Sequence, residues 1–275
     1  ARGSLVHEIL ERFYRKVGNS IDAPDPATSW GSDANNLMAR IADEAFIIAE
    51  QKGITGKTLV WDVEKKKIKS DLNTFLKEDS SFRDQHGVTN KHVETRFGWE
   101  EDAWDEAQVT LPSGEVLRFR GLIDRVDFDE HGNNAYVIDY KTGDPKGFSK
   151  LEQDPVDKGT KIQLPIYILA AESNLDNHVK AKASYWFVSS EGKFSFAPKD
   201  PVGFEYFKKP LANALQTITE SIEQGLFPAN PGSNSFNCRN CDFGTICPSL
   251  RDVYWNRKKN DPRLLDYLAM AGIDK

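Results

Sequence analysis

The chain has 275 residues, and its 36 lysines and arginines against 42 aspartates and glutamates give a formal net charge of −6. Hydrophobic residues make up 39% of the sequence, which suffices for a packed core, and no window approaches the roughly 18 uninterrupted apolar residues of a membrane span. The first ten residues lack the apolar stretch of a secretory signal, so we expect a soluble, cytoplasmic protein with no membrane partner.

The chain begins with Ala1 rather than methionine, and a helical pattern starts almost at once. We therefore expect it to be the C-terminal part of a longer protein. Its length allows one large domain or two small ones. We favour a single domain, 1–275, with a helical insertion at 19–90, a sheet core at 93–200 and a cysteine-bearing tail at 226–275.

The first part of the chain is predicted to be helical. Apolar residues recur at spacings of three and four over 5–17, which indicates an amphipathic helix with Ser4 as its N-cap. The polar stretch 18–36 is rich in turn-forming residues and is typical of a long surface loop. Two further helical patterns cover 37–52 and 59–76.

The pattern then changes to that of strands. Three successive strands suggest a meander, and a helix, a hairpin and a long helix follow. Together they indicate a mixed sheet flanked by helices, an α/β or α+β arrangement. The predicted strands are 93–97, 117–129 and 135–143, the helix is 162–172, the hairpin joins 182–190 to 193–197, and the long helix is 202–224.

Asp124 is expected to be a carboxylate among apolar neighbours. Side chains alternate between faces along the strand 117–129, so Asp124 shares a face with Leu122, while Ile123 and Arg125 take the other face. A buried carboxylate is costly unless it is paired, hydrogen-bonded or bound to a metal.

Asp139 and Lys141 point the same way from the next strand, and Asp139 follows Asp124 by about the length of one hairpin. The two aspartates can thus meet on adjacent strands. Oxygen ligands of this kind suit Mg²⁺ or Mn²⁺, and a lysine beside the metal could orient a water and offset transition-state charge. The constellation fits phosphodiester hydrolysis. The alternative is a structural salt bridge between Asp139 and Lys141, with Asp124 capping a turn.

Three cysteines, Cys238, Cys241 and Cys247, lie within ten residues. Neither their number nor their spread is that of a disulfide framework. Cysteines crowded in this way usually hold a metal. The alternatives to an intact metal cluster are a zinc site completed by a histidine, a degraded or three-ligand cluster, and three unligated thiols.

The runs GLIDRVDFD, VIDYKTG and IQLPIY occur in this order and resemble the PD-(D/E)XK nuclease superfamily, specifically its RecB/AddB-like branch. The resemblance implies an α/β fold with a restriction-endonuclease-like mixed central sheet. It also implies a metal-dependent deoxyribonuclease of the exonuclease type that acts on single-stranded or unwound DNA in repair or recombination. The alternative is a catalytically inactive DNA-binding or helicase-docking module stapled by a metal cluster.

By this resemblance, Asp124 and Asp139 are ligands of Mg²⁺ or Mn²⁺, the Tyr140 carbonyl is a further ligand, and Lys141 is the catalytic lysine. The run GSLVH is similar to the G-x-x-x-H motif of this branch, whose histidine, here His7, joins the metal site. A lone histidine is otherwise more often structural.

Three more residues take catalytic roles by the same resemblance. Glu94 stands where this branch often carries an acidic residue; the alternative is a surface pair with Arg96 or Arg118. Gln163 and Tyr167 match a Q-x-x-x-Y motif that supports the catalytic lysine and the scissile phosphate. Their alternative is an ordinary amphipathic helix packed on the sheet.

The cysteine spacing resembles the last three ligands of the iron-sulfur staple in AddB-like nucleases. The fourth ligand of that staple lies upstream of the G-x-x-x-H helix, so we expect a 4Fe-4S cluster in the intact parent, with the fourth cysteine missing here. The resemblance also implies a helicase domain or subunit as partner. Delivery by such a partner suits a chain whose net negative charge does not favour autonomous tight binding to DNA.

Overall fold

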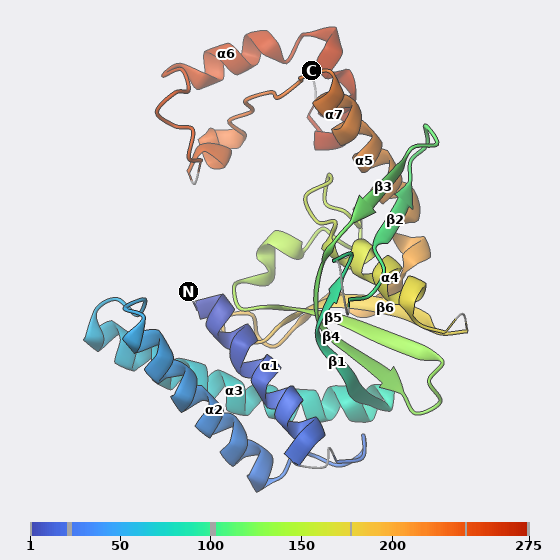
Figure 1. Ribbon diagram of the computed structural model, residues 1–275. Coiled ribbons are helices and arrows are strands. Elements are labelled where there is room, and N and C mark those ends of the chain that lie inside the picture. The colour runs from blue at the N-terminus through green and yellow to red at the C-terminus, as the bar shows by residue number, and fades with distance from the viewer. Residues whose placement is uncertain (1, 21–23, 100–102, 177, 240, 274–275) are drawn as a thin grey trace.

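The computed structural model describes residues 2–20, 24–99, 103–176, 178–239 and 241–273. Its centre is a five-stranded mixed sheet in the order β1-β4-β5-β6-β7 (Figure 1). Two short strands, β2 and β3, form a separate antiparallel ribbon. The strands are β1 (Val88–Phe97), β2 (Ala107–Thr110), β3 (Val116–Phe119), β4 (Gly121–Asp129), β5 (Asn134–Lys141), β6 (Lys180–Phe187) and β7 (Phe196–Gly203).

The strand pairing confirms the predicted meander and hairpin. β1, β4 and β5 are successive antiparallel neighbours in the main sheet, and β6 and β7 pair antiparallel. β5 and β6 run parallel, which requires a crossover, and α4 (Gln163–Asn174) lies in it. β5 is the central strand, and its residues 135–140 are all buried because helices cover both faces of the sheet.

Helices form a layer on each face of the sheet (Figure 1). One apolar core joins the helices α1 (Arg2–Ser20), α2 (Ser32–Gln51) and α3 (Thr58–His86) to one face. A second core joins α4 and α5 (Lys208–Glu223) to the other face. The predicted apolar stripe of α1 is the surface it buries: Ile9, Leu10 and Phe13 are at most 1% exposed.

Several predicted boundaries were wrong. α1 begins at Arg2, so Ser4 is not its N-cap, and α1 and α2 both extend into the predicted loop 18–36. The helix expected over 202–224 begins at Lys208 because β7 continues to Gly203. The strands of the main sheet lie between Val88 and Gly203, and α3 ends at His86 against the left-handed Gly87.

The strand predicted over 117–129 is divided at Arg120 into β3 and β4. β3 pairs with β2, whereas β4 pairs with β1, so the chain changes sheets at this point. Gly98 makes the close crossing possible: it has a φ of +72°, and a Cβ there would come within 2.8 Å of the Arg120 Cβ.

The C-terminal tail carries short helices, the 3₁₀ helix η3 (Ser233–Cys238), α6 (Arg251–Lys258) and α7 (Leu265–Ala271), of which α7 contacts α5. Among the described residues, no helix combines the length and the apolar character needed to cross a membrane.

Candidate active site

The main sheet opens between β4 and β5. Their pairing extends only from Phe128 opposite Ala135 to Arg125 opposite Ile138, although both strands continue beyond this point. In the opening, the backbone N–H of Tyr140 donates to the Asp124 carboxylate over 2.7 Å. A side chain thus replaces the next backbone partner, and Asp124 is held between the two strands.

The neighbouring strand β1 is irregular at the same level. Glu94 has a φ of +47°, which is uncommon for a residue other than glycine and costs backbone energy, and it lies between the pairs Val93–Arg125 and Thr95–Ile123. Positive φ at a non-glycine residue clusters at functional sites. Glu94 and Asp124 therefore face each other at a point where both edges of β4 depart from regular pairing.

This irregularity changes the side-chain alternation along β4. Arg125 contacts Tyr14 of α1, but Ile123 belongs to the core under α4 together with Phe97. The expectation that Ile123 and Arg125 share a face was therefore wrong. Alternation assumes regular backbone, and the backbone at Glu94 and Asp124 is not regular. Leu122, expected as an apolar neighbour of Asp124, is 37% exposed.

His7, Glu94 and Asp124 form the one group of three potential metal-binding side chains that was found in the described part of the chain. One ligand atom from each lies within 4.8 Å of the others. Opposite ligands of an Mg²⁺ ion, with bonds of about 2.1 Å, lie about 4.2 Å apart. The spacing and the nitrogen and carboxylate donors therefore fit a small divalent cation.

The histidine is oriented by a backbone carbonyl. His7 Nε2 lies 3.0 Å from the Tyr140 oxygen, which can only accept, so this nitrogen carries a proton. His7 Nδ1 faces Asp124 Oδ2 at 3.5 Å. In the neutral ring Nδ1 keeps a lone pair directed at the carboxylate, the arrangement in which both atoms can bind one cation.

Asp139 and Lys141 lie next to this group and lead to α4. The Lys141 ammonium is ion-paired with Asp139, whose side chain is 3% exposed, and lies 3.3 Å from Gln163 Oε1. The amide of Gln163 donates in turn to the Tyr167 hydroxyl at 3.5 Å. The structure thus brings the eight predicted residues of the nuclease site into two sets that meet in the chain at Asp139 and Tyr140. One set is His7, Glu94, Asp124 and Tyr140, and the other is Asp139, Lys141, Gln163 and Tyr167.

The carboxylates of this site repel one another. Burial, followed by the charges of Asp124 and Glu11, raises the pKa of Glu94 to about 7. Burial and Asp124 likewise raise the pKa of Asp139 to about 6, although Lys141 acts in the opposite direction. Burial lowers the pKa of His7, but the hydrogen bond and charge of Asp124 outweigh it and the net shift is upward. A bound cation would offset this excess of negative charge.

A buried charged network lies on the α1 side of the sheet, and the sequence did not reveal it. Arg125 is fully buried, pairs with Asp127, and lies 2.6 Å from Asp79 on α3. It also donates to the hydroxyls of Tyr14 and Tyr140. The partner of Arg125, Asp79, is 46 residues away along the chain, and no local pattern marks that contact.

The three cysteines lie in the tail and form no disulfide. Cys238 and Cys247 are partly buried, and Cys241 is exposed. Their chain turns back on itself, since the N–H of Cys247 donates to the Phe243 carbonyl at 3.1 Å. This backbone contact does not bear on a metal cluster, so the iron-sulfur ligands stay a prediction.

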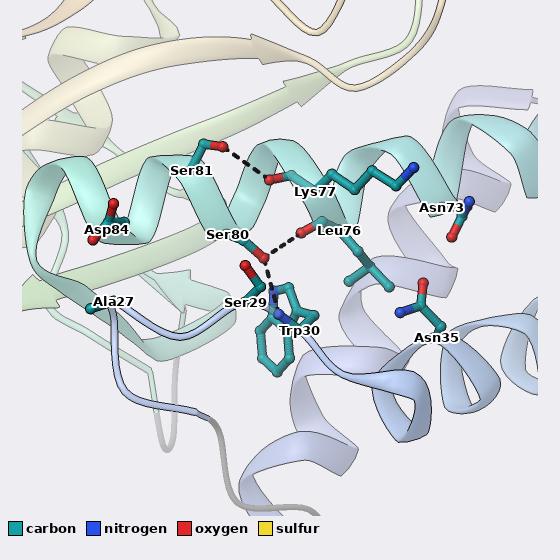
Figure 2. A pocket seen from close by; sticks show the side chains of 10 residues that line it. All are labelled: Ala27, Ser29, Trp30, Asn35, Asn73, Leu76, Lys77, Ser80, Ser81 and Asp84. Atoms are coloured by element: carbon teal, nitrogen blue, oxygen red, sulfur yellow. Dashed lines mark hydrogen bonds between the residues drawn. The ribbon is translucent and has the colours of Figure 1, made fainter.

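A separate polar cavity of about 490 Å³ lies between residues 27–30, α2 and α3 (Figure 2). Its hydroxyl groups are engaged in local bonds: Ser80 accepts from the Trp30 backbone at 3.1 Å and donates to the Leu76 carbonyl at 2.8 Å. The cavity contains none of the predicted site residues. We interpret the cavity as a consequence of how Trp30 packs against α3 and not as a reaction site.

Comparison with known proteins places these observations in a family. A family model described as the PD-(D/E)XK nuclease superfamily matches residues 1–248. Two curated relatives are each named as a subunit of an ATP-dependent helicase/deoxyribonuclease. The one from Clostridium perfringens is 28% identical over 66% of this chain and 15% of its own length, and the one from Alkaliphilus oremlandii is 38% identical over 43% of this chain and 9% of its own length.

The chain therefore spans about 15% or less of the length of these relatives. Among solved structures, that of SSO0001 covers 87% of this chain and 94% of its own, at 13% identity and a TM-score of 0.33. A score this low adds nothing to the assignment.

Proposed function

The chain belongs to the PD-(D/E)XK nuclease superfamily, and from this membership we propose that it is a metal-dependent deoxyribonuclease domain. Its substrate is single-stranded or unwound DNA, which it cleaves as an exonuclease in DNA repair or recombination. The observation that carries the proposal is the convergence of Asp124, Asp139 and Lys141 where β4 and β5 separate.

The residues that would hold Mg²⁺ or Mn²⁺ are Asp124, Asp139, Glu94 and His7, with the Tyr140 carbonyl beside them. The bound cation would polarise the phosphate and acidify the attacking water. Support for this site comes from the donor types, from the spacing of the three ligand atoms, and from the raised pKa values of Glu94 and Asp139.

Lys141 is the residue that acts on the nucleophile. Its ammonium is fixed by Asp139 and Gln163, so it can orient a water and stabilise the charge that develops on the phosphate. Burial and the nearby aspartates raise the pKa of Tyr167 above its usual value, which keeps its hydroxyl protonated and able to donate. Gln163 and Tyr167 thereby position the lysine and the phosphate.

We propose two further features for the protein of which this domain is part. Its relatives are named as subunits of a helicase/deoxyribonuclease, so a helicase domain or subunit is the partner that delivers DNA. An iron-sulfur cluster would be bound by Cys238, Cys241 and Cys247. Since the sequence has three cysteines, the fourth ligand of a 4Fe-4S cluster would have to be another residue. Iron content measured before and after Cys247→Ala tests the cluster.

The test of the nuclease is cleavage of end-labelled single- and double-stranded DNA with Mg²⁺ or Mn²⁺. We expect cleavage that EDTA abolishes, and a loss of at least about 10³-fold in both Asp139→Asn and Lys141→Met. Lys146→Met is the matched control, because Lys146 also pairs with an aspartate, Asp144, but is 90% exposed. It should retain full activity.

Full activity in Asp139→Asn or Lys141→Met would overturn the mechanism. Binding of DNA without any cleavage, insensitive to EDTA, would instead indicate an inactive DNA-binding module.

A further inference from the structure

An exposed surface extends from the carboxylates along the ends of β1 and β4. At this end of the two strands, one face of the sheet lies against α4. Phe97 and Ile123 belong to the core under α4, and a Cβ on Gly121 would come within 2.8 Å of the Phe97 ring. Alternation therefore directs Arg96 and Leu122, which are paired across the two strands, to the face of the sheet that carries α1 and His7. Both are exposed, so α1 does not cover this end of the sheet.

Trp99 follows β1 by two residues and Arg120 immediately precedes β4, so both lie just beyond the paired strand ends Phe97 and Gly121. The Arg120 guanidinium covers one face of the Trp99 indole at 4.4 Å, while 48% of Trp99 remains exposed. Arg120 precedes Asp124 by four residues, about 13 Å along an extended strand. A strand of nucleic acid covers that distance with a few nucleotides.

The Trp99–Arg120 pair has little structural purpose. An exposed cation–π contact contributes only about 0.5–1 kcal/mol to stability. An exposed aromatic face beside a positive charge is the kind of surface on which unpaired nucleobases stack. The arginine adds a charge for the adjoining phosphate, which matters in a chain with a net charge of −6.

We propose that Trp99 and Arg120 form a stacking platform that binds one unpaired base of the DNA strand whose phosphate enters the site at Asp124. This inference rests on the proposed nuclease function and specifies its substrate. A base inside a duplex presents no free face to an indole, so the platform selects single-stranded DNA.

The experiment measures binding of a 5′-labelled oligothymidylate of 12 nucleotides by fluorescence anisotropy, in the full chain carrying Asp139→Asn so that no cleavage occurs. Adding Trp99→Ala should weaken binding by roughly 5- to 150-fold, the range known for loss of one stacked base. Trp99→Phe, which retains a ring, should restore most of the affinity. A blunt duplex of equal length should bind Trp99→Ala and its parent alike.

An abasic position makes the test specific. Moved along the oligonucleotide, it should weaken binding at one position in the parent protein and have no further effect in Trp99→Ala, because both changes remove the same contact. Tyr254→Ala is the matched control: Tyr254 is also an exposed aromatic, 40% accessible, beneath an arginine, Arg257, but lies in the tail. It should leave the affinity unchanged.

Normal binding of the oligonucleotide by Trp99→Ala would overturn the platform, and so would an equal loss of affinity for single strand and duplex in that variant. It would also be overturned if only Tyr254→Ala weakened binding, or if the Asp139→Asn protein bound no oligonucleotide at all. Cleavage is not part of these readouts. An absence of nuclease activity would therefore count against the proposed function alone. Normal binding by Trp99→Ala, when the protein is an active nuclease, would count against the platform alone.

Discussion

Two groups of charged side chains meet at strand β4, and they differ in their balance of positive and negative charge. On the α1 side, Arg125 and Arg83 are matched by Asp79 and Asp127, and the four side chains are almost completely buried. One residue away, Asp124 joins Glu94 and Asp139, and the basic side chains beside these three carboxylates are Lys141 and His7. We call these the balanced network and the acidic site.

The difference separates structural from functional charge. In the balanced network, burial lowers the pKa of Arg125, yet Asp127 and Asp79 more than compensate and the net shift is upward, so the protein itself stabilises the charge of Arg125. In the acidic site, burial and mutual repulsion raise the pKa values of Glu94 and Asp139. A group of carboxylates that the fold does not neutralise is arranged to bind something positive.

The largest expected effect comes from breaking the balanced network. Arg125→Met removes the cationic partner of buried Asp127 and leaves buried Asp79 with Arg83 as its one cationic partner in the network, so we expect the free energy of unfolding to fall by about 3–5 kcal/mol. Urea denaturation measures it. Arg118→Met is the control, since Arg118 also pairs with an acid, Glu106, but its side chain is 69% exposed; its cost should stay within about 1 kcal/mol.

A loss in Arg125→Met no larger than that in Arg118→Met would mean that the network does not hold α1 and α3 to the sheet. The distinction drawn between the two groups of charges would then fail.

The next effect concerns the acidic site. Mn²⁺ at about 100 times its dissociation constant should stabilise the protein by about 2.7 kcal/mol, because the ion binds the folded carboxylates and not the unfolded chain. Asp124→Asn should abolish this gain, and Arg118→Met should retain it. Thermal unfolding in EDTA and in Mn²⁺ measures both. An equal gain in Asp124→Asn would place the ion elsewhere.

The sequence predicted the acidic site better than the balanced network, for a physical reason. Asp124, Asp139 and Lys141 lie on neighbouring strands of one hairpin, so local spacing is enough to bring them together. Asp79 reaches Arg125 across 46 residues, and its position depends on how α3 packs. Glu94 was recognised by resemblance, but its positive φ was not foreseen, because no residue type in the run VETRF requires it.

The errors in the predicted secondary structure have the same physical cause. The local pattern of apolar residues located α1, α4 and the strands of the main sheet, because each contributes buried apolar side chains to one of the two cores. It did not reveal that the run 117–129 changes sheets at Arg120, because β3 and β4 are both extended and only their partners differ.

The smallest effect is the response of the metal-free protein to pH. Folded Glu94 has a pKa of about 7 and folded Asp139 one of about 6, against ordinary values of 4.5 and 3.8. Between about pH 4 and 7 the folded state therefore binds more protons than the unfolded state, and these two groups make the free energy of unfolding decrease as pH rises.

The double variant Glu94→Gln, Asp139→Asn isolates this contribution. Urea denaturation in EDTA from about pH 4 to 7 measures the free energy of unfolding of both proteins, and the parent should lose stability relative to the variant as pH rises. Asp129 gives a control of opposite sign. Burial opposes its ionisation, but hydrogen bonds from Asn134 and Asn133 lower its pKa, so in a second series from about pH 2 to 4 the parent should gain stability relative to Asp129→Asn as pH rises. A flat or rising difference for the double variant would show that the acidic site is already neutralised by the protein, and would erase its contrast with the balanced network.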